Sequence, residues 1–574
     1  MDLNEKLGGI TRRQYDISSA RISLTYRYKI KMSRKSVVIA AAGWPRAWER
    51  GGLIGAGVGA TVGTRPNRSR TSNVPVVQSV AVDTTVLSRT MANTASNNMK
   101  ILNEDNIYEN IKKMEYAVRG PLLIRANEIE KELQKGAKKP FKEVLKANIG
   151  DAHAMGQRPI TFLRQVLSLT VLPDLLNDPN YPEDAKSRAK ALLQACRGSV
   201  GCYTDSMGLE IVRKHIAQYI ENRDGIPSNY ENIFLGNGAS DAIKSVLKLF
   251  AQKINNKPTG VMIPIPQYPL YSASISEFGL GEIGYFLDED NKWALNIAEL
   301  ERALNEAKKW SNPRVLVVIN PGNPTGQVLN RSNIEDILRF AHKHKLFIFA
   351  DEVYQDNIYD KNCCFHSFKK VAFELGAPYN QMELASFMSI SKGYMGECGI
   401  RGGYAELVNV DATVMQLLRK SISAMLCPTV LGQIVMDVVA NTPKPNEPSY
   451  TKFEEEKRNT LLSLAERSQL AVDMLNSIPG YKTNPSMGAM YVFPRFEIPA
   501  KAIEAAKAKG QSPDLFYAFK LLEETGICVI AGSGFGQLPG TYHFRTTILP
   551  QKEKMKTMLN SLKEFHLKFL KEYS

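Results

Sequence analysis

The sequence predicts an α/β protein built on a mostly parallel central sheet that is flanked by helices. Short apolar runs at 261–265, 315–319, 346–350 and 384–389 recur between helix-like stretches. They lack an alternation of apolar and polar residues, which is typical of strands buried on both faces of a parallel sheet. Because several runs lead directly into polar or glycine-rich segments, we expect a ligand site at the carboxyl ends of the strands.

The chain of 574 residues is too long for a single hydrophobic core, so several domains are expected. A proline-rich break at 442–448 separates the strand-rich middle from two long helical stretches, 453–476 and 552–571. We therefore predict an extension at 1–98, an arm with part of a small domain at 99–225, a large ligand-binding domain at 226–440, and the rest of the small domain at 441–574.

Most of the net charge of +15 belongs to the N-terminal extension. Residues 1–100 hold 16 Lys and Arg against 5 Asp and Glu, whereas the rest of the chain holds 57 against 53. The extension is rich in Arg, Ser, Gly and Thr, which favours import into the mitochondrial matrix, although Asp2, Glu5 and Asp16 are unusual in a transit peptide. A tail without any address, on a cytosolic protein, is the alternative.

The body of the chain lacks the patterns of nucleic-acid-binding, membrane-spanning and metal-binding proteins. Its charges nearly balance, and no basic stripe is interleaved with aromatic residues. No run of about 18 uncharged apolar residues occurs. None of the seven cysteines forms a Cys-x-x-Cys pair, so neither a zinc site nor a disulfide framework is expected. We expect small-molecule partners, with no metal, nucleic acid or membrane.

Two helical segments are predicted before the first apolar run at 261–265. Apolar residues at helical spacing run from 106 to 135, with a break at Gly120-Pro121 and an end at Gly136. A further helix is predicted at 241–253, directly after the small residues 236–240. Small residues at a helix start let backbone N–H groups approach a phosphate, and the helix dipole adds attraction.

The segment after the last apolar run places a reactive amine beside groups that suit a phosphate. Ser389, Ser391 and Lys392 follow the strand, and Arg401 comes nine residues after the lysine. A lysine in this place can form an imine with an aldehyde cofactor. The hydroxyls and the arginine can hold a phosphate dianion. For this segment alone, a surface lysine in a glycine-rich turn explains the pattern equally well.

Two other strand ends supply groups that would tune a pyridine ring. Asn323 lies between prolines in the turn 320–326, which suits one fixed hydrogen bond. Asp351 ends an apolar strand, where a carboxylate requires a cationic partner such as a protonated pyridine nitrogen. Taken alone, a helix cap or an ordinary ion pair is the commoner explanation of such an aspartate. Together with the lysine and the phosphate cup, these residues point to pyridoxal phosphate.

The same constellation resembles that of the pyridoxal-phosphate aminotransferases of fold type I, over roughly residues 140–574. Within this family, the stretches 148–159, 201–206, 391–399 and 544–550 are most similar to the alanine aminotransferase branch. The resemblance implies a smaller α+β domain beside the large one, and a homodimer with shared active sites. It also implies transfer of the amino group of L-alanine to 2-oxoglutarate by a ping-pong mechanism.

The resemblance further assigns roles to individual residues. For the cofactor ring, it implies that Lys392 forms the imine, Asp351 pairs with the pyridine nitrogen, Asn323 and Tyr354 bind the phenolic oxygen, and Tyr268 stacks on the ring. For the phosphate, it implies a cup made of Ala239, Ser240, Ser389, Ser391 and Arg401, and a contact from Tyr203 to the phosphate in the neighbouring subunit. For the substrate, it implies that Gly150 and Arg545 bind the α-carboxylate. Lys392, Asp351 and Tyr354 are the expected catalytic residues. A cis peptide bond is expected at Asn323–Pro324.

One spacing departs from the commonest family pattern. The phosphate arginine usually follows the lysine by eight positions, and here it follows by nine, an extra residue that the alanine branch shares. Three other functions stay open: a glyoxylate-using aminotransferase of the same subgroup, a pyridoxal-phosphate lyase on the same fold, and a cofactor-binding regulator. The last would require an attached helix-turn-helix, for which residues 1–100 show no helical period.

Overall fold

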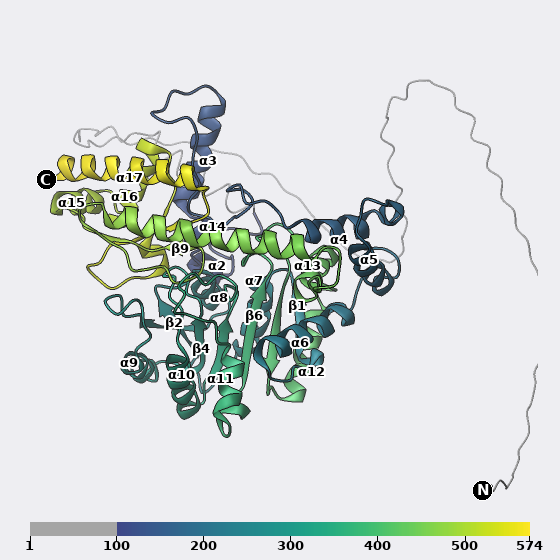
Figure 1. The fold of residues 1–574 in the computed structure, drawn as a ribbon. Helices are drawn as coiled ribbons and strands as arrows, with labels where there is room; N and C mark the ends of the chain where they lie inside the picture. Colours follow the sequence, from purple (N-terminus) through teal and green to yellow (C-terminus); the bar gives the residue numbers. More distant parts are fainter. Residues whose placement is uncertain (1–99) are drawn as a thin grey trace, which may run out of the picture. The chain divides into compact units, whose positions relative to one another are not determined.

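A central sheet of seven strands organises residues 100–574, the part of the chain that the computed structural model describes (Figure 1). Its strands are β1 (Ile233–Gly236), β2 (Thr259–Ile265), β3 (Gly281–Phe286), β4 (Asn312–Ile319), β5 (Phe347–Asp351), β6 (Leu384–Ser389) and β7 (Gly403–Val408). They lie in the order β1-β7-β6-β5-β4-β2-β3. β7 is antiparallel to both neighbours and the remaining pairs are parallel, so the predicted mostly parallel sheet is confirmed. The predictions for residues 1–98 fall outside the described part.

Alternate residues of the central strands face two different cores. In β4, Val315 and Val317 pack into one core cluster, whereas Leu316 and Val318 pack into the other. A strand buried on both faces requires apolar residues at successive positions, which explains the uninterrupted apolar runs of the sequence. No helix among residues 100–574 combines the length and the apolar character needed to cross a bilayer.

Helices cover both faces of this sheet. One face is covered by α9 (Ile297–Ala307), α10 (Arg331–His344) and α11 (Phe368–Leu375), and the other by α7 (Ala239–Leu247), α8 (Leu270–Glu277) and α12 (Ala412–Ser423). The other elements of this region are α6 (Glu210–Asp224), α13 (Val430–Ala440), η3 (Tyr230–Asn232), η4 (Lys248–Phe250) and η5 (Tyr379–Gln381). The predicted helix at 241–253 begins slightly earlier and tightens into η4 after Leu247.

The N-terminal arm breaks at the predicted place. Its elements are α2 (Glu109–Lys113), η1 (Ala117–Arg119), α3 (Pro121–Gln134), α4 (Thr161–Val171), η2 (Pro173–Asn177) and α5 (Glu183–Ala195). Pro121 begins α3, where its missing N–H costs no hydrogen bond, and Gly136 follows with φ 85°. The first helix is shorter than predicted because the backbone becomes extended at Met114 before Val118 turns into the core.

The C-terminal part combines long helices with very short strands. Its elements are α14 (Tyr450–Asn476), β8 (Tyr481–Lys482), β9 (Tyr491–Val492), β10 (Arg495–Phe496), α15 (Ala500–Ala508), α16 (Pro513–Thr525), β11 (Ile530–Ala531), η6 (Gly532–Phe535), β12 (Phe544–Thr547) and α17 (Lys552–Tyr573). β12 lies between β11 and β9, and β8 pairs with β10. Figure 1 shows α14 crossing over the large sheet, with α15, α16 and α17 gathered at one side. The two long helices were predicted, whereas the five short strands were not.

Candidate functional site

A cavity of about 430 Å³ opens where β4, β5 and β6 end. Its lining includes all but one of the residues singled out in the sequence: Gly150, Ala239, Ser240, Tyr268, Asn323, Asp351, Tyr354, Ser389, Ser391, Lys392, Arg401 and Arg545. The exception is Tyr203, whose surface is 74% exposed. Because the carboxyl ends of parallel strands meet at one edge of the sheet, residues far apart in sequence come together here.

Asp351 is a buried carboxyl group that has no cationic partner in hydrogen-bond contact among residues 100–574. It ends β5 and is 3% exposed. Tyr271 Oη donates a hydrogen bond to Asp351 Oδ2 at 2.8 Å. Burial nevertheless raises the pKa of Asp351 to about 6, because desolvation outweighs this hydrogen bond. The site therefore suits a ligand that brings positive charge to the carboxylate.

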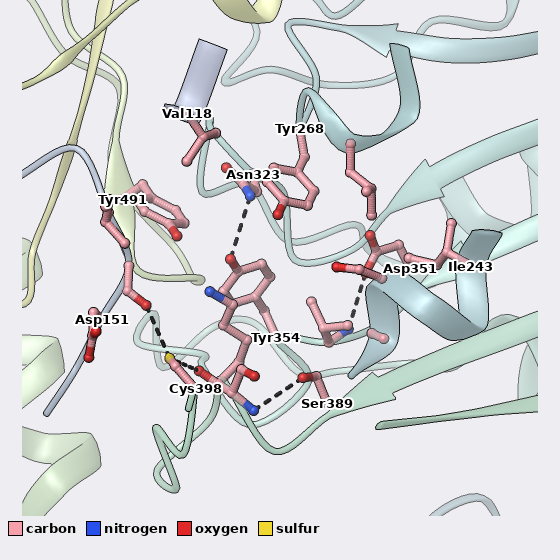
Figure 2. Close-up of a pocket in the computed structure, with 18 of the residues that line it drawn as sticks. Val118, Asp151, Ile243, Tyr268, Asn323, Asp351, Tyr354, Ser389, Cys398 and Tyr491 are labelled. Carbon is pink, nitrogen blue, oxygen red and sulfur yellow. Dashed lines mark hydrogen bonds between the residues drawn. The ribbon is translucent and has the colours of Figure 1, made fainter. Parts of the chain in front are cut away.

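Asn323 and Tyr354 converge on one side of the cavity, as Figure 2 shows. Asn323 Nδ2 lies 3.5 Å from Tyr354 Oη, the geometry of a long hydrogen bond. The peptide bond between Asn323 and Pro324 is cis, as predicted. Tyr268 also lines this region, and its Oη is 2.9 Å from Tyr116 Oη.

Arg401 and the start of α7 form a cradle that fits a phosphate. Arg401 Nη2 donates to Asn237 O at 3.1 Å, and Arg401 Nη1 lies 3.4 Å from Ser391 Oγ. Gly238 precedes α7 with φ 85°, and a Cβ there would lie 2.2 Å from Arg401 Nη2. Only glycine leaves room for the guanidinium beside the helix N-terminus, where backbone N–H groups and the dipole favour an anion.

Lys392 and Tyr491 influence each other's protonation inside the cavity. Burial disfavours the charged lysine, but Tyr491 and Cys398 outweigh burial and raise the pKa of Lys392. Burial also opposes ionisation of Tyr491, yet Lys392 and Arg545 outweigh burial and lower the pKa of Tyr491. Both groups face Gly150, since a Cβ there would lie 2.1 Å from Tyr491 Oη and 3.3 Å from Lys392 Nζ.

Arg545 is a buried cation that forms no ion pair with a carboxylate among residues 100–574. It is 1% exposed, and it donates to Asn323 Oδ1 at 3.0 Å and to Asn148 O at 2.6 Å. Its guanidinium carbon lies 4.0 Å from the centre of the Tyr491 ring. Within the described part of the chain, Arg545 Nε and Asn148 Oδ1 are buried without a hydrogen-bond partner. A buried arginine with an unused donor is suited to hold an incoming carboxylate.

Sequence reasoning missed three tyrosines of this site. Tyr271 follows Tyr268 by three residues at the start of α8, so helical spacing could have indicated it. Tyr491 lies in a two-residue strand, and Tyr116 lies in the N-terminal arm; neither has a local signal in the sequence.

The groups that line the cavity include an amine, a phosphate cradle, a buried carboxylate and a buried guanidinium. They fit pyridoxal phosphate together with an amino or oxo acid.

Comparisons with known proteins agree with this geometry. The sequence signature of the family "Aminotransferase class I and II" matches residues 174–562. Alanine aminotransferase 2 of Xenopus laevis is 58% identical, with 83% of this chain and 88% of that one aligned. Alanine aminotransferase 1 of Homo sapiens is 56% identical over 83% and 96% of the two chains. A "probable alanine aminotransferase, mitochondrial" of Dictyostelium discoideum is 45% identical over 83% and 90%.

Solved structures share the fold at much lower sequence identity. An aminotransferase from Escherichia coli is 24% identical with a TM-score of 0.64, covering 81% of this chain and 98% of that one. An alanine aminotransferase from Pyrococcus furiosus is 21% identical with a TM-score of 0.63, covering 81% and 100%. This likeness confirms the predicted fold. With the family signature and the relatives at more than half identity, it leads to one conclusion: the chain belongs to the class I and II aminotransferase family.

Proposed function

We propose that this chain is a pyridoxal-phosphate-dependent aminotransferase that moves the amino group of L-alanine to 2-oxoglutarate, giving pyruvate and L-glutamate. One observation carries the proposal. A lysine amine, a buried carboxylate and a buried arginine without a carboxylate partner face the same cavity. The names of relatives that are 45–58% identical support alanine as the donor.

The chain's own residues would position the reaction. Pyridoxal phosphate, when bound, supplies an aldehyde that condenses with amines and a ring that withdraws electrons from the substrate Cα–H bond. Lys392 would hold the cofactor through Nζ, and after displacement by the substrate amine would take the proton from Cα and pass it to the carbon that carried the cofactor's aldehyde. Asp351 would keep the ring nitrogen protonated. Arg545 would bind the α-carboxylate through parallel N–H donors, beside Gly150.

The remaining lining residues would fix the cofactor in one orientation. Asn323 and Tyr354 would hold the phenolic oxygen, and Tyr268 would stack on the ring. The phosphate would be held by Ala239, Ser240, Ser389, Ser391 and Arg401. This proposal is supported by the contact of Arg401 with Ser391 and by the glycine beside the start of α7.

We further propose a homodimer in which Tyr203 reaches the phosphate in the neighbouring subunit. Tyr203 is 74% exposed and lies outside the cavity of its own chain, so its ring is accessible to a second copy. Sedimentation of the cofactor-bound protein should give a dimer. A fully active monomer would contradict the assignment.

We also propose a division of the chain into domains and a location in the cell. Residues 99–225 and 441–574 would form the arm and small domain around the large domain at 226–440, and residues 1–98 would direct import into the mitochondrial matrix. The name of the Dictyostelium relative is consistent with that location.

A substrate screen of the purified full-length protein, supplied with pyridoxal phosphate, tests the activity. Amino donors are paired with 2-oxoglutarate and with glyoxylate, and we expect alanine with 2-oxoglutarate to react fastest. Faster turnover with glyoxylate would favour the other aminotransferase, and release of oxo acid without a second oxo acid would favour a lyase. Absence of turnover with cofactor still bound would favour a regulator. Lys392→Ala serves as the control and should abolish repeated turnover and borohydride-trapped cofactor.

A further inference from the structure

Two adjacent cysteines, Cys363 and Cys364, lie in a loop outside the cavity. Cys364 is exposed, Cys363 is half-buried, and neither forms a disulfide within residues 100–574. Cys364 Sγ lies 3.1 Å from His366 Nε2, which is a hydrogen bond between a thiol and an imidazole. The reaction proposed above uses none of these three side chains, so their arrangement requires another explanation.

His366 is placed to take a proton from the Cys364 thiol. Burial lowers the pKa of His366, and the charges of Arg331 and Lys370 act in the same direction. The ring is therefore neutral at pH 7, and a neutral imidazole can accept the thiol proton through the nitrogen that faces the sulfur. Because the thiolate is the form of cysteine that attacks an oxidant, this contact favours reaction at Cys364.

Cys363 is the second thiol that a reversible two-step oxidation requires. Its Sγ donates to Met487 Sδ at 3.7 Å. Burial raises the pKa of Cys363, and Asp360 and Cys364 add to this effect, so Cys363 is a protonated thiol beside the more exposed Cys364. Neighbouring Cα atoms are about 3.8 Å apart, less than the usual disulfide range of about 4.4–6.8 Å. A disulfide between the two would therefore be strained, and strained, exposed disulfides are readily reduced again.

The loop of the two cysteines continues a segment that contacts the cofactor lysine's own loop. Tyr359 N donates to Met487 O at 2.8 Å, so the residue that contacts Cys363 also holds this segment. Two residues earlier, Asn357 Oδ1 accepts a hydrogen bond of 2.8 Å from Gly393 N. Gly393 follows Lys392 directly. Consecutive contacts therefore lead from the cysteines to the backbone beside the lysine.

We propose that Cys363 and Cys364 form a redox-sensitive dithiol, which hydrogen peroxide closes to a disulfide and which slows the proposed transamination when it closes. The Cys364 sulfur attacks one peroxide oxygen, so an S–O bond forms and the O–O bond breaks. The departing hydroxide receives the thiol proton from His366. The Cys363 sulfur then attacks the Cys364 sulfur, so the S–S bond forms, the S–O bond breaks, and water leaves with the proton of the Cys363 thiol. The dithiol is oxidised by two electrons, and the peroxide is reduced to two molecules of water.

Mass spectrometry of the cofactor-loaded full-length protein tests the oxidation. After hydrogen peroxide and then alkylation, the peptide with both cysteines should carry a disulfide and no alkyl group, and dithiothreitol should restore both thiols. Cys363→Ser should stop at a sulfenic acid on Cys364, which dimedone traps. His366→Gln should slow the first step by roughly 10-fold or more, because the proton acceptor is lost. Cys427→Ser, at a half-buried cysteine outside the cavity, is the matched control and should change neither step. Oxidation of Cys364 no faster than that of Cys427, or unchanged by His366→Gln, would overturn the proposal.

Phenylarsine oxide tests the pairing of the thiols without any oxidation. Its arsenic forms two As–S bonds while its oxygen leaves as water with the two thiol protons, so only two thiols that lie together hold it tightly. The unmodified protein and Cys427→Ser should retain the arsenical against a monothiol and release it to a dithiol. Cys363→Ser and Cys364→Ser should each lose it to the monothiol. Equal retention by these two variants and the unmodified protein would overturn the pairing.

Turnover before and after oxidation tests the link to Lys392, and this part of the inference rests on the proposed function. Closing the disulfide should lower kcat by roughly 2- to 30-fold, the range for coupling through packed contacts, and dithiothreitol should restore it. Cys364→Ser should turn over normally with or without peroxide. A loss that persisted in Cys364→Ser would belong to another thiol, such as Cys398 of the cavity, and would overturn the link. If the unmodified enzyme failed to exchange alanine with 2-oxoglutarate, the proposed function would fail, while the disulfide and arsenical measurements would still decide whether the dithiol exists.

Discussion

At the scale of single residues, burial of the Asp351 carboxylate destabilises the ligand-free fold at neutral pH. Its carboxyl group is buried next to Tyr271, and its pKa rises to about 6. In an unfolded chain the pKa of an aspartate is about 3.9. The folded, ligand-free protein therefore binds more protons than the unfolded chain between these values, and its stability falls as pH rises through this window.

The predicted fall of stability with rising pH can be tested at two pH values. Above the window, Asp351→Asn should raise the unfolding free energy of the cofactor-free protein by about 1–3 kcal/mol, the equivalent of a shift of about two pKa units. Below about pH 4 the two proteins should be equally stable. Urea unfolding at about pH 4 and about pH 8 measures the difference, and Asp174→Asn, at an exposed aspartate, controls for the loss of a charge.

The same substitution should have the opposite effect on function. Without the carboxylate, the ring nitrogen would lose its proton, and turnover should fall by more than ~10²-fold, as for other charge-stabilising groups in active sites. A variant with unchanged turnover would contradict the proposed role of Asp351 at the ring nitrogen. A variant less stable than the unmodified protein at about pH 8 would contradict the predicted cost of burying the carboxylate.

At the scale of elements, the sequence was informative wherever one pattern continued for several residues. β2, β4, β5 and β6 were predictable because strands buried on both faces consist of apolar residues. Strands of two residues, such as β8 and β9, show no period at all, and their pairing depends on partners far along the chain. Tertiary contacts decide such strands, so sequence patterns could not reveal them.

The residues of the site also divide into those that the sequence could predict and those that it could not. Lys392, Asp351 and Asn323 follow strands that the sequence identified, so their meeting at one sheet edge could be predicted. Tyr491 enters from the short β9, and Tyr116 enters from the arm. Neither neighbourhood contains a motif, because their positions result from packing between distant segments. The resemblance to a family supplied Arg545, for which the local sequence alone gave no role.

One buried ion pair joins a helix to the antiparallel strand of the sheet. Lys369 of α11 lies 2.6 Å from Glu406 of β7, and each side chain is 3% exposed. Ser228 Oγ donates to the same carboxylate at 2.6 Å. Lys369→Met should lower the unfolding free energy by about 3–5 kcal/mol, because Glu406 would keep an uncompensated buried charge.

A second variant distinguishes lost charge from lost packing. The double substitution Lys369→Met with Glu406→Leu removes both charges and should recover most of the stability in urea unfolding. A double variant as unstable as the single one would mean that the lysine stem and the glutamate pack in a way that apolar residues cannot replace.

At the scale of the whole molecule, the described part of the chain supplies the residues proposed to hold cofactor and substrate within one subunit. The described residues that line the cavity fall between Tyr116 and Arg545. A chain beginning at Met99 should therefore fold, bind pyridoxal phosphate and turn over alanine at the normal rate in vitro. In cells it should lose import into the organelle. Loss of activity on truncation would reveal a structural role of the extension, whereas cytosolic full-length protein would refute only the targeting proposal.

The residues that line the cavity come from segments that are synthesised at different times. Asp351 ends β5 and Lys392 follows β6, whereas Arg545 lies on β12, much later in the chain. At ~5–20 residues per second, the residues between Lys392 and Arg545 take roughly 8–30 s to synthesise. During that interval the nascent chain would contain the amine proposed to hold the cofactor but not the guanidinium proposed to bind the substrate carboxylate. On these assignments, the groups for the cofactor and for the amino acid are synthesised at different times.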